Sequence, residues 1–241
     1  LKLIAGDVHR VQKKAMDGAY QEMRMAKSAT QQFEEQGFFE YHIYDLQRRT
    51  TIKDKQTKQI KLLEATGVAL QKEFLVRGTT VYRTGRTMEK NIKLPVSVYI
   101  IFMNSSENAL GMPLPEGTVR LYKADRGGGQ QFIGEDRIHH VPKDEKVRLK
   151  AGEAFDITAE KTQTDFKRIT SQLNESEWEI VLRNHREDDT PVGVLEPMAA
   201  NCEIVSNSHP FKKVDASTIR FDVQVPRDKE ITIRYRVKSG L

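Results

Sequence analysis

Strict alternation of apolar and polar residues near the C-terminus is the feature that most constrains the fold of this chain. It occurs at residues 219–225 (IRFDVQV) and again at residues 231–237 (ITIRYRV). A period of two places one row of side chains on a buried sheet face and the other row in water, so both segments are predicted to be strands. Because the connection at residues 226–230 is short, we expect the two strands to form an antiparallel hairpin.

Similar patterns upstream predict an all-β protein. Trp178, Ile180 and Leu182 mark a further one-sided strand, and shorter ones follow at 192–195 and 203–205. About six such strands after residue 164 would make a small immunoglobulin-like sandwich. Earlier candidate strands, separated by turn residues, predict another sheet system. They lie at residues 40–46, 59–63, 69–76, 90–104, 118–124, 130–133, 145–150 and 154–162. We therefore expect an antiparallel β-sandwich architecture made of two packed sandwiches.

One helical segment is expected before the strands. Between residues 12 and 36, small and apolar residues recur at steps of three and four, and Gly37 would stop the helix. The expected domains are 1–37, a strand fragment and helical linker; 38–163, a first β-sandwich; and 164–241, an immunoglobulin-like β-sandwich. The chain opens with LKLIAGDV and without methionine, which favours a fragment or a processed product.

Composition narrows the function classes. The 39 Lys and Arg residues outnumber the 34 Asp and Glu residues by five, but they are interleaved with the acids, which argues against a nucleic-acid footprint. The single cysteine, Cys202, excludes an internal disulfide and a multi-cysteine zinc site, and its alternation with Ile204 favours a small buried side chain. The longest apolar run, residues 96–103, has the length of a buried strand, so no membrane span is expected.

Three glycines at residues 127–129 raise the question of a phosphate-binding loop. A phosphate loop needs a helix after its glycines, because the helix N-terminus supplies the amide donors. Here the glycines lie between two candidate strands, and the lysine of a Walker loop is missing. The segment is therefore predicted to be a hairpin tip.

Acids and histidines gather in two segments. Glu135, Asp136, His139 and His140 would be metal ligands if they converged, and a metal-assisted hydrolase is one alternative for the function. Adjacent histidines on a strand point to opposite faces, however, which favours a solvated strand edge.

The second segment holds His185, Asp188 and Asp189. Its spacing does not match an EF-hand loop, and a turn rich in Asn and Asp forms without any ligand. We assign no catalytic residue, no cofactor and no metal from these patterns.

The outward face of the predicted C-terminal hairpin is the candidate interaction surface. It carries Arg220, Arg234, Arg236 and Lys238, which would suit an anionic partner such as a glycan or a surface polymer. The alternative is that these charges only protect the sheet from edge-to-edge association.

Several segments resemble a known family. They are FEYHIYDL at 39–46, TKQI at 57–60, NALGMPLPEGTVRLY at 108–122, FIGED at 132–136 and GEAFD at 152–156. Together they resemble the bacterial domain of unknown function that forms the C-terminal part of mucoidy-inhibitor-A-like proteins. The likeness runs from about residue 38 to the C-terminus.

The resemblance implies an all-β domain at the end of a longer exported protein, in the periplasm or secreted. It supplies no active site. It implies structural roles for Pro113, Pro115 and Gly117 in a turn and for Tyr122 and Phe155 as core-sized side chains. Other members carry a longer coiled-coil insertion where this chain has one short helical segment. The leading expectation is a non-catalytic, envelope-associated binding or structural module whose partner is a protein or an envelope polymer; the hydrolase and the anionic-polymer binder remain alternatives.

Overall fold

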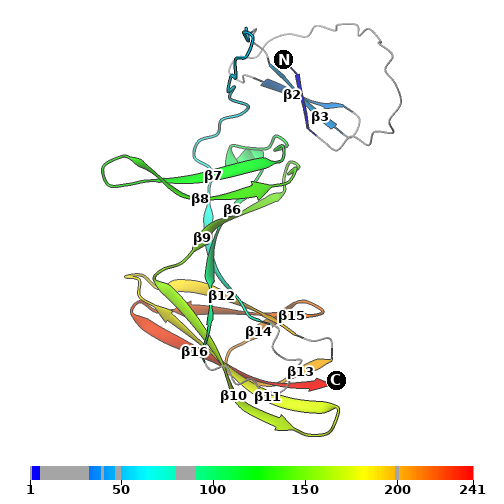
Figure 1. The fold of residues 1–241 in the computed structure, drawn as a ribbon, viewed down its shortest axis with the longest axis vertical. Coiled ribbons are helices and arrows are strands. Elements are labelled where there is room, and N and C mark those ends of the chain that lie inside the picture. Colours follow the sequence, from blue (N-terminus) through cyan, green and yellow to red (C-terminus); the bar gives the residue numbers. More distant parts are fainter. Residues whose placement is uncertain are drawn as a thin grey trace. The chain divides into compact units, whose positions relative to one another are not determined.

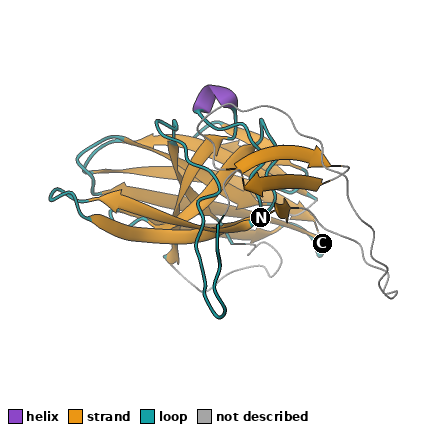
Figure 2. Ribbon diagram, turned by 90° about the horizontal axis from the view of Figure 1, so that it is seen from above, coloured by secondary structure: helices purple, strands orange, loops and turns teal. Residues whose placement is uncertain are grey.

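The computed structural model describes residues 2–5, 33–38, 41–46, 50–79, 91–198 and 201–240, and these residues form an all-β protein (Figure 1). The first strands are β1 Lys2–Ala5, β2 Phe33–Phe38, β3 Tyr41–Leu46, β4 Gln71–Arg77, β5 Ile92–Leu94, β6 Val96–Met103, β7 Gly117–Ala124 and β8 Gln130–Ile138. The later strands are β9 Lys146–Glu153, β10 Ile157–Arg168, β11 Leu173–Asn184, β12 Thr190–Pro197, β13 Cys202–Asn207, β14 Phe211–Asp215, β15 Thr218–Val225 and β16 Lys229–Gly240. A single 3₁₀ turn at Ser106–Asn108 is the helical element that Figure 2 shows among the described residues.

Two packed sheets make up the main body, which is a β-sandwich as predicted. One sheet has the strand order β13-β16-β11-β10-β5, and the other has the order β14-β15-β12-β4-β6-β9. Most neighbouring strands are antiparallel, while β12 and β4 run parallel. Two smaller sheets, β1-β3-β2 and the hairpin β7-β8, complete the described strands.

The core lies between the two large sheets. Trp178, Ile180 and Leu182 of β11 are fully buried, as their alternation predicted. Across the interface, the rings of Phe221 on β15 and Tyr235 on β16 lie with their centres 5.7 Å apart. Each such side chain contributes roughly 1.5–3 kcal/mol through the burial of its apolar surface, so the core is the main source of stability.

The expected C-terminal hairpin is wrong. Strand β15 pairs with β12 and β14 in the six-stranded sheet, whereas β16 pairs with β11 and β13 in the five-stranded sheet. The short connection after Val225 therefore crosses from one sheet to the other. Alternation shows that each strand buries one face, but it does not say whether two successive strands share an edge or face each other across a core.

Two other expectations also change. Residues 33–36, the end of the expected helix, belong to strand β2, which pairs with β3; the rest of that helix lies outside the described residues. The expected strand at 59–63 has no regular structure. Instead, Ile60 and Leu62 pack against Tyr44 and Leu46, so their spacing reflects local packing and not sheet alternation.

The chain divides into two compact units built from discontinuous segments. One comprises Leu1–Ala69, Phe102–Thr118 and Arg137–Val147, and the other comprises Leu70–Ile101, Val119–Asp136 and Arg148–Leu241. The division expected at residue 163 falls inside β10, which pairs with β11 from Ile157 to Arg168. Both large sheets combine strands from before and after that residue, because strand pairing joins segments that are far apart in sequence.

In the first unit, three of the family-like segments meet. The Tyr44 hydroxyl donates a hydrogen bond to the Pro113 carbonyl at 2.6 Å, and Met112 packs with Ile60 on the same small cluster. Asn104 is fully buried beside the 108–122 segment, and its side-chain amide donates to the carbonyls of Met112 and Pro142, both at 2.9 Å. These segments therefore hold one another together.

The glycine stretch is the tip of the β7-β8 hairpin, as predicted. The Asp125 amide donates to the Gly129 carbonyl at 2.8 Å, and Gly128 has a positive φ of 81°. The two aromatic residues expected in the core are exposed instead: Tyr122 to 53% and Phe155 to 93%. Tyr122 packs against Phe132 on the hairpin with ring centres 5.6 Å apart.

Candidate functional site

Three of the four acids and histidines at the end of β8 and just after it contact different partners. Glu135 pairs with Arg120 at 3.2 Å, and Asp136 accepts a hydrogen bond from the Lys150 amide at 2.7 Å. His140 Nδ1 accepts from the Glu116 amide at 3.2 Å. Among the described residues, no group of three or more His, Cys, Asp or Glu side chains could hold a metal ion.

The second acidic segment anchors loops at one end of the sandwich. Asp188 pairs with Arg186 at 3.1 Å, and Asp189 accepts from the Arg227 amide at 2.8 Å. The His185 amide donates to the Asp156 carbonyl at 2.8 Å. These carboxylates satisfy loop amides and a neighbouring guanidinium, which accounts for them structurally.

The predicted basic face does not form. Arg220 lies on β15 in one large sheet, while Arg234, Arg236 and Lys238 lie on β16 in the other. On β16, Arg234 pairs with Glu179 at 2.7 Å. Arg236 pairs with Asp165, Glu175 and Glu177.

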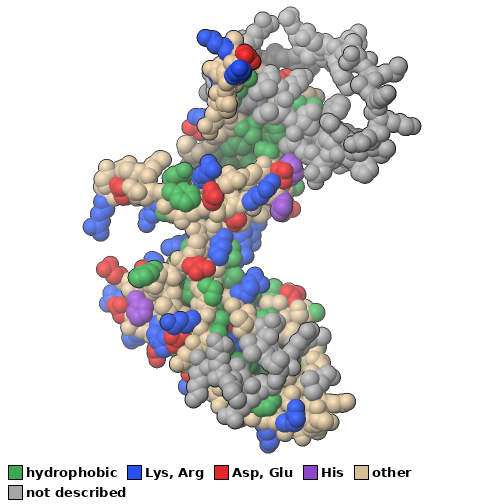
Figure 3. Space-filling view, viewed as in Figure 1, with side chains coloured by type: hydrophobic (Ala, Val, Ile, Leu, Met, Phe, Trp, Pro, Cys, Tyr) green, Lys and Arg blue, Asp and Glu red, His purple; other side chains and the backbone are tan. Residues whose placement is uncertain are grey.

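The register explains this neutralisation. Strand β11 places Glu177 opposite Arg236, Glu179 opposite Arg234 and Glu175 opposite Lys238. Hydrogen bonds from Arg236 to Glu175 and Glu177 raise its pKa further above its ordinary value. The surface is an ion-pair ladder between two strands. On the face of the molecule drawn in Figure 3, Lys and Arg side chains likewise lie among Asp and Glu side chains and do not form a separate basic patch.

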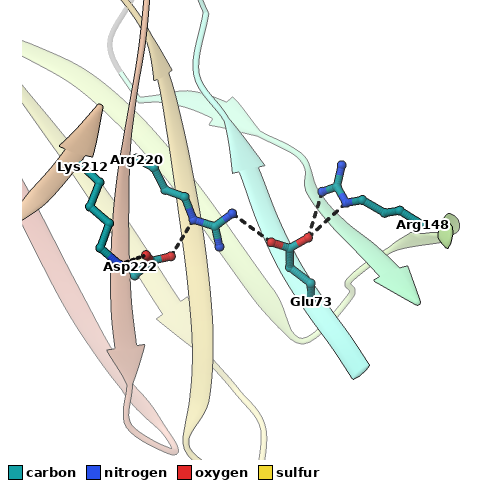
Figure 4. A network of polar contacts seen from close by, with 5 residues as sticks. All are labelled: Glu73, Arg148, Lys212, Arg220 and Asp222. Carbon is teal, nitrogen blue, oxygen red and sulfur yellow. Dashed lines mark hydrogen bonds and ion pairs between the residues drawn. The ribbon is translucent and has the colours of Figure 1, made fainter. Parts of the chain in front are cut away.

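Arg220 instead belongs to a charged network on the outer face of the six-stranded sheet (Figure 4). Glu73 on β4 accepts hydrogen bonds from Arg148 Nη2 at 2.9 Å and from Arg220 Nη1 at 2.9 Å. Arg220 Nε also donates to Asp222 at 2.6 Å. Lys212 on β14 reaches the same carboxylate at 3.5 Å, so the network spans the sheet from β9 to β14.

Two neighbouring residues set the direction of these guanidinium groups. Gly193 lies on β12 between Arg220 and Glu73, and a Cβ atom there would lie 2.7 Å from Arg220 Nη2. The glycine therefore leaves the space that lets Arg220 cross the strand. The guanidinium carbon of Arg148 lies 3.5 Å from the centre of the Tyr99 ring, a cation–π contact that holds the second arginine.

A groove of about 410 Å³ borders this network. Its lining includes Lys72, Glu73, Arg220 and Asp222 together with apolar atoms of Ile101 and Val223. The groove and the network together carry two carboxylates, Glu73 and Asp222, and four cations, for a net charge of +2. The cations are Lys72, Arg148, Lys212 and Arg220.

Lys72 is a partly buried cation among charges of both signs. Burial lowers its pKa, the neighbouring Arg186 and Lys123 lower it further, and Asp188 opposes them. Its ammonium lies 4.6 Å from the centre of the Phe74 ring. An anion beside Lys72 would favour its charged form.

Sequence reasoning identified Arg220 but missed Glu73 and Arg148. The sequence did show that Glu73 and Arg148 are charged residues within predicted strands, where such side chains are expected to point outward. That signal also fits solvent exposure, so only the pairing of β4 between β12 and β6 reveals the network.

In comparisons with known proteins, no family model, no curated protein and no solved structure matches this chain. Within the described residues, no helix has the length and apolar character needed to cross a membrane.

Proposed function

We propose that this chain is a non-catalytic binding module of the bacterial envelope, exported from the cytoplasm, and that it holds an acidic polymer in the groove beside Glu73. The observation that supports the binding role is the pair of guanidinium groups that Glu73 orients at the edge of the groove. The exported location is supported by the family resemblance of the sequence.

The chemistry of the groove favours carboxylate or phosphate groups. Planar guanidinium groups bind such anions through two parallel hydrogen bonds. Arg148 Nη1 and Arg220 Nη2 do not donate in the hydrogen bonds among the described residues, so each has donor capacity for a ligand. The apolar lining beside them would contact the carbon skeleton of the polymer.

Preorganisation supports binding at this surface. Glu73, Arg148 and Arg220 are all partly buried, and each is held by a partner on a different strand. A ligand would therefore meet side chains that have already lost much of their rotamer freedom, which reduces the entropic cost of association.

Isothermal titration calorimetry with polygalacturonate, a carboxylated polysaccharide, tests this function. We expect Arg148→Gln to weaken binding about tenfold, since a charge-assisted hydrogen bond to the ligand is lost. Arg234→Gln is the matched control, because Arg234 lies on the other sheet and pairs with Glu179. Affinity should fall with rising salt, and neutral dextran should not bind.

Two outcomes would contradict the proposal. Equal losses in Arg148→Gln and Arg234→Gln would show that only the overall charge matters. Absence of polygalacturonate binding at low salt, with both variants folded by circular dichroism, would remove the acidic-polymer function.

A further inference from the structure

A lysine and a glutamate meet inside the core of the sandwich. Lys161 lies on β10 in the five-stranded sheet, and Glu196 lies on β12 in the six-stranded sheet. Both side chains are 0% exposed, and Lys161 Nζ contacts Glu196 Oε2. The pair therefore bridges the two sheets at a point that solvent does not reach.

Aromatic residues enclose the pair. Lys161 Nζ lies 4.6 Å from the centre of the Trp178 ring, and the Tyr235 hydroxyl donates to Glu196 Oε2 at 2.8 Å. On the other side, a Cβ atom at Gly78 would lie 1.9 Å from Glu196 Oε1. Glycine at this position makes room for the carboxylate, so the backbone itself is adapted to the pair.

Such an environment favours uncharged groups over ions. Burial lowers the pKa of Lys161, while the neighbouring Glu196 opposes this effect. Transfer of one proton from the ammonium to the carboxylate converts the pair into a nucleophilic amine and a carboxylic acid. Groups held in contact by a fold react with effective concentrations of roughly 10⁵–10⁸ M when their geometry is favourable.

We propose that Lys161 and Glu196 condense into an intramolecular amide bond that links the two sheets covalently. The Lys161 amine attacks Glu196 Cδ and forms a new C–N bond. One C–O bond of the acid breaks, and the oxygen leaves as water with one proton from the acid and one from the amine. The Tyr235 hydroxyl, which donates to Oε2, stabilises the negative charge that develops on that oxygen.

The reaction needs no oxidant, reductant or additional reactant. A buried ammonium and carboxylate are replaced by one neutral amide, which removes the cost of keeping two ions away from water. The link would hold β10 to β12 even when the surrounding hydrogen bonds break. This modification is independent of ligand binding in the groove.

Intact-mass spectrometry of the purified 241-residue chain tests the link. The mass is expected to be lower than the sequence mass by one water molecule. Peptide mapping should then recover one branched peptide that contains both Lys161 and Glu196. The exposed Lys61–Glu64 pair, in contact at 2.7 Å, is the internal control and should remain unlinked because water solvates it.

Variants distinguish this link from other losses of water. Lys161→Met and Glu196→Ala should retain their full sequence masses. Glu196→Gln should lose one ammonia molecule instead, since an amide nitrogen replaces the leaving oxygen. Tyr235→Phe should leave a larger fraction of the chain unlinked.

The wild-type mass alone can overturn the proposal, even if a variant does not fold. A chain that keeps its full sequence mass after prolonged incubation at neutral pH contains an ion pair and no amide. A loss of water that maps to any other residues would overturn it as well. Equal linkage in Tyr235→Phe would overturn the role given to that hydroxyl.

Discussion

At the residue scale, buried polar side chains specify this fold. Asn104 ties the carbonyls of Met112 and Pro142 together, and Tyr44 is tied to Pro113. Each polar atom that is removed from water must find a partner, so such residues determine which loops can lie next to one another. None of these partnerships was visible from residue spacing, since the two members of a pair can lie 69 positions apart, as Tyr44 and Pro113 do.

Ionisation of Tyr44 should make the first unit less stable at alkaline pH. Burial, with a smaller contribution from nearby Glu35, raises the pKa of Tyr44 from 10.0 to about 12. The unfolded chain loses this proton near pH 10, whereas the folded chain keeps it until about pH 12. Between these values the unfolded state binds fewer protons, so stability that is fully present below pH 10 should fall by up to about 2 kcal/mol.

Urea unfolding followed by circular dichroism at pH 9 and pH 11 measures this loss. Tyr44→Phe is the control, because it removes the titrating group. At pH 9 it should cost about 1 kcal/mol relative to the wild type, through the lost hydrogen bond to Pro113, and its stability should not change with the ionisation of residue 44, so at pH 11 the difference from the wild type should disappear or reverse. A variant with the same pH dependence as the wild type would show that another group is responsible.

At the element scale, strands were predictable but their neighbours were not. The alternation at 219–225 and 231–237 correctly located β15 and β16, and the glycines correctly located the turn between β7 and β8. Alternation reports only which side of a strand is apolar. The expected hairpin of β15 and β16 was wrong because packing across a core and pairing along an edge impose the same pattern on a sequence.

The edges of the large sheets carry protective features. Edge strands β13 and β14 each contain a register irregularity, at Ile204/Ser206 and Lys213/Asp215. Strand β14 also exposes Lys212 and Lys213. Bulges and exposed lysines hinder pairing with another chain. Edge protection was the alternative role proposed for the basic residues on β15 and β16, but the features that provide it lie on the neighbouring strands β13 and β14.

The ladder between β11 and β16 should contribute to stability in a way that depends on salt. Arg236→Gln leaves Glu175, Glu177 and Asp165 without their shared cation. We expect the free energy of unfolding to fall by only about 1 kcal/mol, because these groups are partly exposed to water. High salt should reduce the loss, because it screens the repulsion among the three carboxylates.

Lys238→Gln is the matched control on the same strand. Lys238 faces the same direction as Arg236 but makes no ion pair among the described residues, so its replacement should change stability by less than about 0.5 kcal/mol. Denaturant titrations at low and high salt measure both variants. Equal losses in the two would contradict the ladder.

At the scale of the whole molecule, the two compact units are interleaved along the chain. The second unit takes strands β4, β5 and β6 from the first half of the sequence and most of its other strands from the second half. Composition and turn residues suggested consecutive domains, because both are local properties. Long-range strand pairing determined otherwise.

A fragment that begins at residue 164 should therefore not fold. It lacks the core side chains Phe74, Val76, Leu94, Val96 and Ile157, each of which contributes roughly 1.5–3 kcal/mol by burial. We expect the amide proton spectrum of residues 164–241 to show little dispersion, whereas that of the full chain should be dispersed. A dispersed spectrum from the fragment would show that a separate C-terminal sandwich exists after all.

The sequence by itself determined the class of this protein and the place of most strands. Alternation, turn residues and the supply of apolar side chains are local consequences of burying one face of a strand, and they can be read without knowing the neighbours. The tertiary structure decided which strands share a sheet, which charges neutralise one another and which polar groups are buried. Arg220 illustrates the difference. The alternation of its strand predicted that it lies on an outward face. It lines a groove only because Gly193 on the neighbouring strand β12 leaves it space and Glu73 on the next strand, β4, binds it. These properties depend on contacts between residues far apart in sequence, and such contacts exist only in the folded chain.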